Sequence, residues 1–156
     1  MSVAITEENI EKFVRGWFQA LDQHVSLEEV SQFLADPDLE MIFPEKTLHG
    51  LGDFAVWYSG GRYSDGQQAP GVTNIFFDEV HNVVNIESTI AGDHANLDLV
   101  AAWTTLWIDP PKPTTRRVSL DSTHEWKVRG SNRNVYGLEI VSYKVALQYA
   151  PGSARL

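Results

Sequence analysis

The second half of the sequence consists of four long runs of β-branched and aromatic residues, and this feature constrains the fold most. The runs cover 73–90, 94–108, 115–129 and 137–149. The segments AGDH, DPPKPT and GSNRN separate them, and each is rich in turn-forming residues. Four consecutive strands joined by short connections predict an antiparallel sheet of long hairpins.

The first half has helical periodicity instead. Thr6 can cap a first helix, in which apolar residues recur at helical spacing at Ile10, Phe13, Val14, Trp17 and Leu21. Ser26 and Glu29 form a capping box that predicts a short second helix ending before Pro37.

A short strand is expected at 39–43, followed by a third helix within 50–63 that ends at Gly60 and Gly61. Helices first and strands later indicate an α+β fold, with the helices collected on one face of the sheet. Because the chain has neither repeats nor an interdomain linker, we expect a single domain covering 1–156.

Composition excludes several classes of site and partner. The chain has no cysteine, so disulfides, thiol nucleophiles and thiolate metal ligands are excluded. The net charge is −9, and residues 1–111 hold 18 of the 21 acidic side chains, which argues against a nucleic-acid partner. No apolar stretch approaches the roughly 20 residues that span a bilayer, so no membrane partner and a cytoplasmic location are expected.

The strand at 94–108 is apolar on both sides. Trp103 and Leu99 share one face, while Val100, Ala102 and Leu106 share the other. A sheet covered on one side only would alternate apolar with polar residues, so the second face is expected to meet another subunit. The sequence therefore predicts a homodimer formed through the sheet.

The other face combines large rings with polar groups. In LDSTHEWKV, residues 120–128, the side chains of Ser122, His124 and Trp126 share one parity. These rings are compatible with an ordinary aromatic core, but a dry core seldom holds this many polar groups on one strand face. An apolar hollow with a few convergent polar groups is typical of a small-molecule site.

The order of elements resembles the nuclear transport factor 2-like superfamily, in particular its SnoaL-like bacterial members. The resemblance rests on WFQALDQHVSLEEVSQFLADPDLEMIFP, on AGDHANLDL, and on STHEWKV followed by GLEIVSYKVALQ. It implies a curved sheet wrapped around the first helix to form a cone, whose open end binds small hydrophobic molecules. The superfamily includes steroid isomerases, scytalone-type dehydratases, polyketide cyclases and epoxide hydrolases, and dimers through the sheet are common in it.

The resemblance can be carried over only residue by residue. Trp17 falls where steroid isomerases keep a tyrosine, and Phe43 where they keep an aspartate base, which argues against steroid isomerase activity. His124 falls at their second aspartate and Trp126 at an aromatic position. Tyr143 is on the final strand, where polyketide cyclases keep an acid.

Asp22 matches the aspartate that orients a catalytic histidine in dehydratases and dehydrochlorinases. Those enzymes supply the histidine near the start of the long strand after the third helix, where this chain has Val72, Thr73 and Asn74. We therefore expect His124 to serve from another strand. The direction of His81 cannot be assigned, because FFDEVHNVV does not alternate cleanly and indicates a bulge.

Two functions remain open at this stage. The first is a cofactor-independent isomerase, dehydratase or cyclase that acts on a small hydrophobic or aromatic substrate, with His124 as acid/base and Asp22 as its orienter. The second is a non-catalytic ligand-binding or assembly domain of the same fold. In both, the expected wall residues are Trp17, Phe43, Trp103, Ser122, Trp126 and Tyr143. No histidine pair has metal-site spacing, so neither a metal nor another cofactor is expected.

Overall fold

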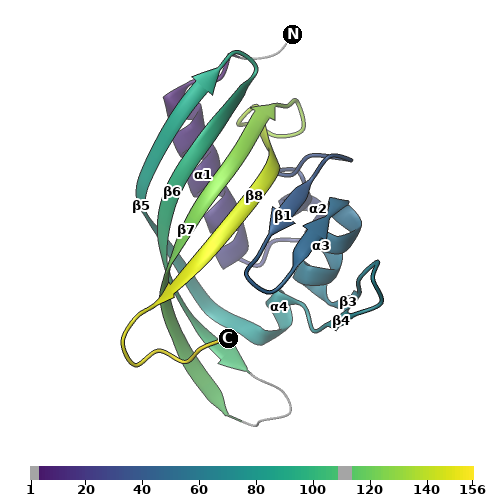
Figure 1. Cartoon of the computed structure of the whole chain (residues 1–156), viewed down its shortest axis with the longest axis vertical. Helices are drawn as coiled ribbons and strands as arrows, with labels where there is room; N and C mark the ends of the chain where they lie inside the picture. The colour runs from purple at the N-terminus through teal and green to yellow at the C-terminus, as the bar shows by residue number, and fades with distance from the viewer. Residues whose placement is uncertain (1–3, 109–113) are drawn as a thin grey trace.

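The computed structural model describes residues 4–108 and 114–156. The turn predicted at DPPKPT therefore lies mostly outside the described residues, at 109–113. The four long strands are β5 (Phe76–Ala91), β6 (His94–Ile108), β7 (Thr115–Gly130) and β8 (Leu138–Tyr149), and each pairs antiparallel with the next (Figure 1).

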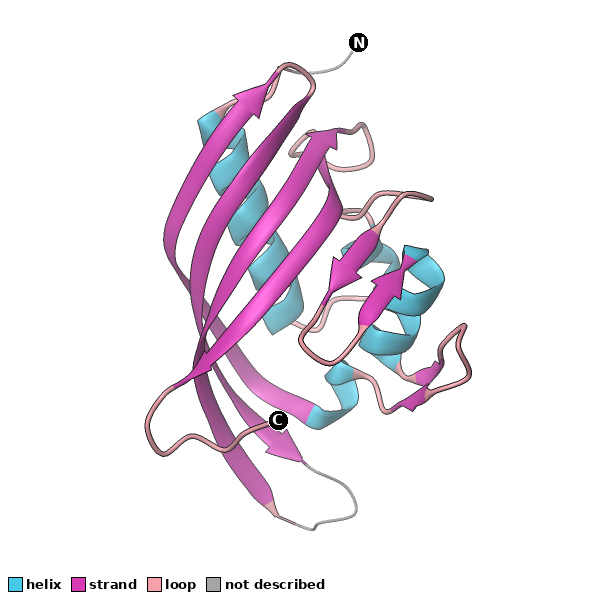
Figure 2. Ribbon diagram, viewed as in Figure 1, coloured by secondary structure: helices cyan, strands magenta, loops and turns pink. Residues whose placement is uncertain are grey.

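Six of the described strands form one large mixed sheet in the order β2-β1-β8-β7-β6-β5. β1 (Glu40–Ile42) pairs in parallel with β8, and β2 (Thr47–His49) pairs antiparallel with β1. The sheet is strongly curved, and α1 lies across one of its faces (Figure 2). The α+β prediction is confirmed, although the parallel pairing of β1 and the strand β2 are additions to it.

The helices begin where their caps predict. α1 (Glu7–Asp22) is capped by the Thr6 hydroxyl and α2 (Leu27–Ser31) by the Ser26 hydroxyl, each of which accepts a hydrogen bond from a backbone N–H. α3 (Gly50–Ser59) ends at Gly60 and is followed by the small ribbon of β3 (Gly61–Arg62) and β4 (Gln68–Ala69). Residues 73–75, predicted as the start of a strand, belong to the single turn α4 (Val72–Ile75).

The apolar face of α1 fills the hollow of the sheet. Trp17 is fully buried and its ring contacts those of Phe33, Phe54, Trp126 and Tyr143. Burying a large side chain of this kind contributes about 2 to 3 kcal/mol, so α1 is held to the sheet mainly by its rings. No helix within the described ranges has the length and hydropathy needed to cross a membrane.

A bulge in β5 determines which side chains enter the hollow. Phe77 pairs with Leu106 and Val80 with Thr104, so two residues of β5 face the single Thr105 of β6. Asp78, inside the bulge, has a φ of 50°. The Thr105 hydroxyl donates to the Phe77 carbonyl over 2.9 Å. This carbonyl, which lies where the pairing of β5 with β6 is disrupted, thus has a hydrogen-bond donor. Beyond the bulge, His81 pairs with Trp103 and lies on the inner face.

Candidate functional site

A cavity of about 1050 Å³ lies between the sheet and the segment from α3 to β5. Its lining is mainly aromatic and aliphatic and includes Tyr58 and Tyr63. Five of the predicted site residues line it: Phe43, Trp103, Ser122, His124 and Tyr143. Trp17 and Trp126 do not; both are buried in the core behind it.

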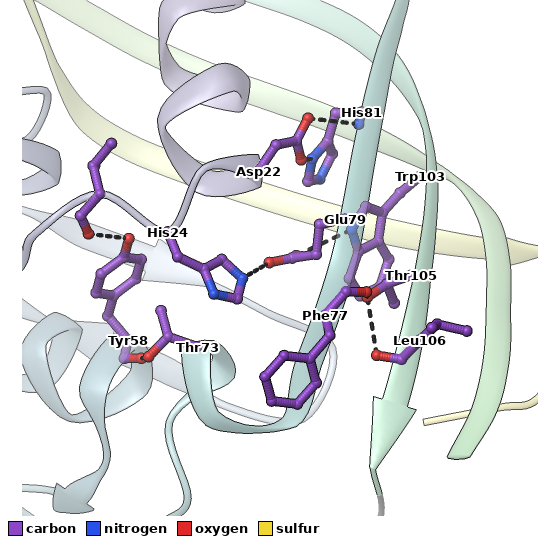
Figure 3. Close-up of polar contacts among 11 residues, drawn as sticks. Asp22, His24, Tyr58, Thr73, Phe77, Glu79, His81, Trp103, Thr105 and Leu106 are labelled. Atoms are coloured by element: carbon purple, nitrogen blue, oxygen red, sulfur yellow. Dashed lines mark hydrogen bonds and ion pairs between the residues drawn. The ribbon is translucent and has the colours of Figure 1, made fainter.

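Asp22 binds His81, not His124. One carboxylate oxygen of Asp22 lies 2.5 Å from His81 Nδ1, and the other accepts the His81 backbone N–H over 2.9 Å (Figure 3). The predicted pairing of Asp22 with His124 is therefore wrong. The last residue of α1 reaches the inner face of β5, which is close to α1, whereas His124 lies two strands further away on β7.

The Asp22 contact defines the chemistry of the His81 ring. An ionised carboxylate only accepts hydrogen bonds, so Nδ1 of neutral His81 carries the proton and Nε2 is the basic atom. Within the described residues, no side chain or backbone group bonds to that Nε2. His81 itself lines the cavity.

Two aromatic rings hold the His81 imidazole in place. The Phe18 ring lies 4.8 Å from it between centroids, and the Trp103 ring stacks at 5.8 Å with an interplanar angle of 19°. These two ring contacts restrict rotation of the imidazole. The site thus provides an oriented base with limited access to water.

Both ring nitrogens of His124 belong to a linear series of hydrogen bonds. The Trp126 indole N–H donates to His124 Nδ1 over 3.2 Å, and His124 Nε2 lies 2.8 Å from the Ser122 hydroxyl. That hydroxyl lies 3.1 Å from the Ala101 carbonyl and donates to it. An indole N–H only donates, so the proton of neutral His124 is on Nε2 and both ring nitrogens are occupied.

The pKa of His124 agrees with this arrangement. Burial, with a smaller contribution from the charge of His81, lowers its pKa to about 3. A second proton, on Nδ1, would point at the Trp126 N–H, which is itself a donor and cannot accept it. His124 is therefore a neutral member of the cavity wall at physiological pH.

A second carboxylate–imidazole pair lies beside the first. Glu79 Oε2 is hydrogen-bonded to His24 Nε2, and the Trp103 indole N–H donates to Glu79 Oε1 over 3.2 Å (Figure 3). The Glu79 side chain is 8% exposed and lines the cavity, whereas that of His24 is 25% exposed. Burial is the largest influence on Glu79 and raises the pKa of its carboxyl, although His24 and His81 oppose the rise.

The turn at the C-terminal end of α1 fixes the positions of both Asp22 and His24. The Val25 N–H bonds to the Ala20 carbonyl, and the His24 N–H bonds to the Leu21 carbonyl, which is a Schellman arrangement. His24 takes the position usually held by glycine and has a φ of 50°. The Tyr58 hydroxyl donates to the Val25 carbonyl over 2.6 Å and fixes this turn against α3.

Sequence patterns missed Glu79, His81 and His24. The signal that was present is the loss of alternation at FFDEVH, which correctly indicated a bulge but not its direction. A further signal was the position of Asp22 and His24, which lie two residues apart at the end of the first helix and therefore beside the same turn. No group of three or more histidine, aspartate or glutamate side chains in the described ranges is arranged to hold a metal ion.

Comparison with known proteins identifies relatives only by structure. No protein-family model matches the chain, and no curated protein matches it. A putative scytalone dehydratase from Novosphingobium aromaticivorans superposes with a TM-score of 0.70 at 14% identity, covering 95% of this chain and 88% of that protein. The protein LinA superposes with a TM-score of 0.67 at 11% identity, covering 96% of this chain and 92% of that one.

A nuclear transport factor 2-like superfamily protein from Salmonella enterica serovar Typhimurium superposes with a TM-score of 0.65 at 14% identity. The alignment covers 93% of this chain and 92% of that protein. At such identities the similarity shows the fold and not the activity. The chain therefore has the nuclear transport factor 2-like fold, in agreement with the resemblance found in its sequence.

Proposed function

We propose that the protein is a cofactor-independent enzyme that removes a proton from carbon in a small hydrophobic or aromatic substrate. His81 is the base and Asp22 positions it. The observation that carries this proposal is the double contact of Asp22 with the ring and the backbone of His81, which leaves His81 Nε2 as the basic atom at the cavity. Isomerisation, dehydration and cyclisation all begin with such a step.

The surroundings of the pair support this chemistry. The cavity is mostly apolar, and burial raises the pKa of Tyr58 in its lining to about 12. The Asp22 carboxylate accepts the His81 Nδ1–H and keeps the ring in the tautomer whose Nε2 can take a proton. The structures of a putative scytalone dehydratase and of a hexachlorocyclohexane dehydrochlorinase share the fold and are compatible with elimination chemistry here.

The test is hydrogen exchange at carbon. A panel of small aryl ketones is incubated with the protein in D₂O, and deuterium uptake next to the carbonyl is followed by mass spectrometry. We expect uptake with the wild type and a loss on the order of 100-fold in His81→Gln and Asp22→Asn. His94→Asn, on the exposed hairpin between β5 and β6, is the matched control. Equal uptake by wild type and His81→Gln would contradict the proposal.

The second candidate function is ligand binding without turnover. It is favoured by His124, whose two nitrogens are bonded within the wall, so that this part of the cavity offers shape but no free acid or base. The same ketone panel distinguishes the two functions. Ligands that raise the melting temperature while no ketone exchanges deuterium would support the binding function.

We also propose that the protein forms a homodimer through the outer face of the sheet. Val80 is 48% exposed on β5, and the outward residues Val100, Ala102 and Leu106 of β6 continue the same apolar face. Contiguous exposed apolar surface of this kind is typical of an interface.

A further inference from the structure

The two carboxylate–imidazole pairs have opposite orientations towards the cavity. In the first pair the imidazole of His81 lines the cavity and Asp22 lies behind it. In the second pair the carboxyl of Glu79 lines the cavity and His24 lies behind it, nearer to solvent. Both cavity-facing groups come from β5, two residues apart, which places them on one wall at a separation on the order of 7 Å along the strand.

Burial acts against the ionised form of the Glu79 carboxyl. The carboxyl is almost fully buried, and burial, the largest cause, raises its pKa, while the His24 hydrogen bond and the charges of His81 and His24 oppose the rise. The Trp103 N–H donates to one oxygen and His24 contacts the other, but each carboxyl oxygen has two lone pairs, so these contacts leave capacity for a proton, unlike the ring nitrogens of His124. A carboxylic acid kept neutral at an apolar site can donate its proton during a reaction, as paired acids and bases in other enzymes do.

His24 provides a route by which Glu79 can regain a proton. Its imidazole contacts Glu79 through Nε2, and a quarter of its side chain is exposed. An imidazole exchanges protons near neutral pH, so it can take one from water and pass it to the carboxylate. The Schellman turn holds this ring in place at the cost of a left-handed backbone at His24.

We infer that Glu79, backed by His24, donates a proton to a leaving oxygen, so that the substrate is a β-hydroxy carbonyl compound and the reaction is a dehydration. This inference rests on the proposed function of His81. His81 takes the proton from the carbon next to the carbonyl, and the C–H electron pair forms the new carbon–carbon double bond. The C–O bond breaks, its electron pair stays on oxygen, and the Glu79 proton completes water. The proton on His81 then returns to the Glu79 carboxylate through His24 and solvent.

The nature of the leaving group follows from the acid. Hydroxide is a poor leaving group and needs a proton, whereas chloride departs as a stable anion and needs none. A buried proton donor beside the base is therefore expected in an enzyme that expels a hydroxyl group. The presence of both a proton donor, Glu79, and a base, His81, on one cavity wall therefore favours dehydration over dehydrohalogenation at this site.

The experiment compares two leaving groups that give one product. A panel of 4-aryl-4-hydroxybutan-2-ones and their 4-chloro counterparts is used, and the common enone is followed by absorbance above the uncatalysed rate. We expect Glu79→Gln to lower the rate with the hydroxy compounds on the order of 100-fold, and with the chloro compounds far less. His24→Asn, which tolerates the left-handed backbone, is expected to lower the hydroxy rate selectively as well. His81→Gln lowers both rates, and Glu87→Gln, an exposed carboxyl on the same strand, changes neither.

The outcomes separate this inference from the proposed function. Deuterium exchange without any selective effect of Glu79→Gln would overturn the inference and leave His81 as the base. Conversion of the chloro compounds alone would do the same. Absence of both exchange and elimination would overturn both proposals. A substrate-free readout covers variants that fold poorly: carboxyl-carbon NMR of the wild type should show Glu79 titrating above ordinary glutamate, and an ordinary or lower midpoint would overturn the inference.

Discussion

His81 and His124 both line the cavity and both contact the Phe18 ring, at 4.8 and 5.4 Å between centroids, yet their chemistry differs. His81 has an ionisable partner on one nitrogen, whereas His124 is bonded on both nitrogens by neutral groups. Strand parity correctly placed His124 in the cavity wall, but it could not reveal how the ring nitrogens are occupied. That depends on the neighbours Trp126 and Ser122, whose directions follow from packing.

The depressed pKa of His124 predicts a loss of stability in mild acid. The unfolded chain binds a proton at His124 below a pKa of 6.5, while the folded chain holds the ring neutral down to about 3. The contribution of His124 to the free energy of unfolding is therefore complete above pH 6.5 and is lost as the pH falls towards 3. Between about pH 7 and pH 5, this one group lowers the free energy of unfolding by about 2 kcal/mol.

Urea denaturation at the two pH values measures this effect. His124→Gln should lose less stability than the wild type over the same interval, while the exposed control His94→Asn should behave like the wild type. Glu79, whose pKa is raised, acts in the opposite direction but is present in all three proteins and cancels. An identical loss in wild type and His124→Gln would show that His124 does not titrate as described.

At the scale of elements, the site is the meeting point of one helix end and one bulge. The last turn of α1 contributes Asp22 and His24, and the bulged start of β5 contributes Glu79 and His81. The resemblance placed the histidine position of dehydratases at 72–74, where this chain has no histidine, whereas the structure supplies His81 from β5, which begins only at Phe76 because α4 occupies 72–75. Element order was predictable from periodicity, whereas the bulge depends on local backbone geometry.

The Schellman end of α1 gives a prediction at this scale. His24→Ala and His24→Gly both delete the imidazole and its contact with Glu79, so they differ mainly in the cost of a left-handed backbone. We expect His24→Gly to be more stable than His24→Ala by about 1 kcal/mol. Urea denaturation of the two variants checks this, and equal stabilities would argue against the left-handed turn at His24.

At the scale of the whole molecule, the curved sheet gives one face to the cavity and the other to the outside. The alternation of 94–108 predicted the inner face correctly: Ala95, Leu97, Leu99, Ala101 and Thr105 are buried. The α+β order was also predictable because each half has its own periodicity. The cavity was not predictable in detail, since Trp17 and Trp126 turn into the core and only part of the expected aromatic wall remains exposed to a ligand.

The apolar outer face predicts the oligomeric state. We expect light scattering after size-exclusion chromatography to give the mass of a dimer for the wild type. Val80→Glu should shift the protein towards the monomer, because a charge buried in an apolar interface is costly. Val135→Glu, at a 93% exposed loop position, is the matched control and should remain dimeric. A monomeric wild type, or a Val80→Glu variant that dimerises equally well, would argue against this interface.

The most direct test of the central claim, that Asp22 prepares His81 as the base of the cavity, is the tautomeric state of the histidines. Long-range proton–nitrogen NMR at about pH 7 reads which ring nitrogen carries the proton. The structure predicts Nδ1–H for His81 and Nε2–H for His124, and it predicts that Asp22→Asn removes the preference of His81 alone. A wild-type His81 protonated on Nε2, or unaffected by Asp22→Asn, would contradict the account.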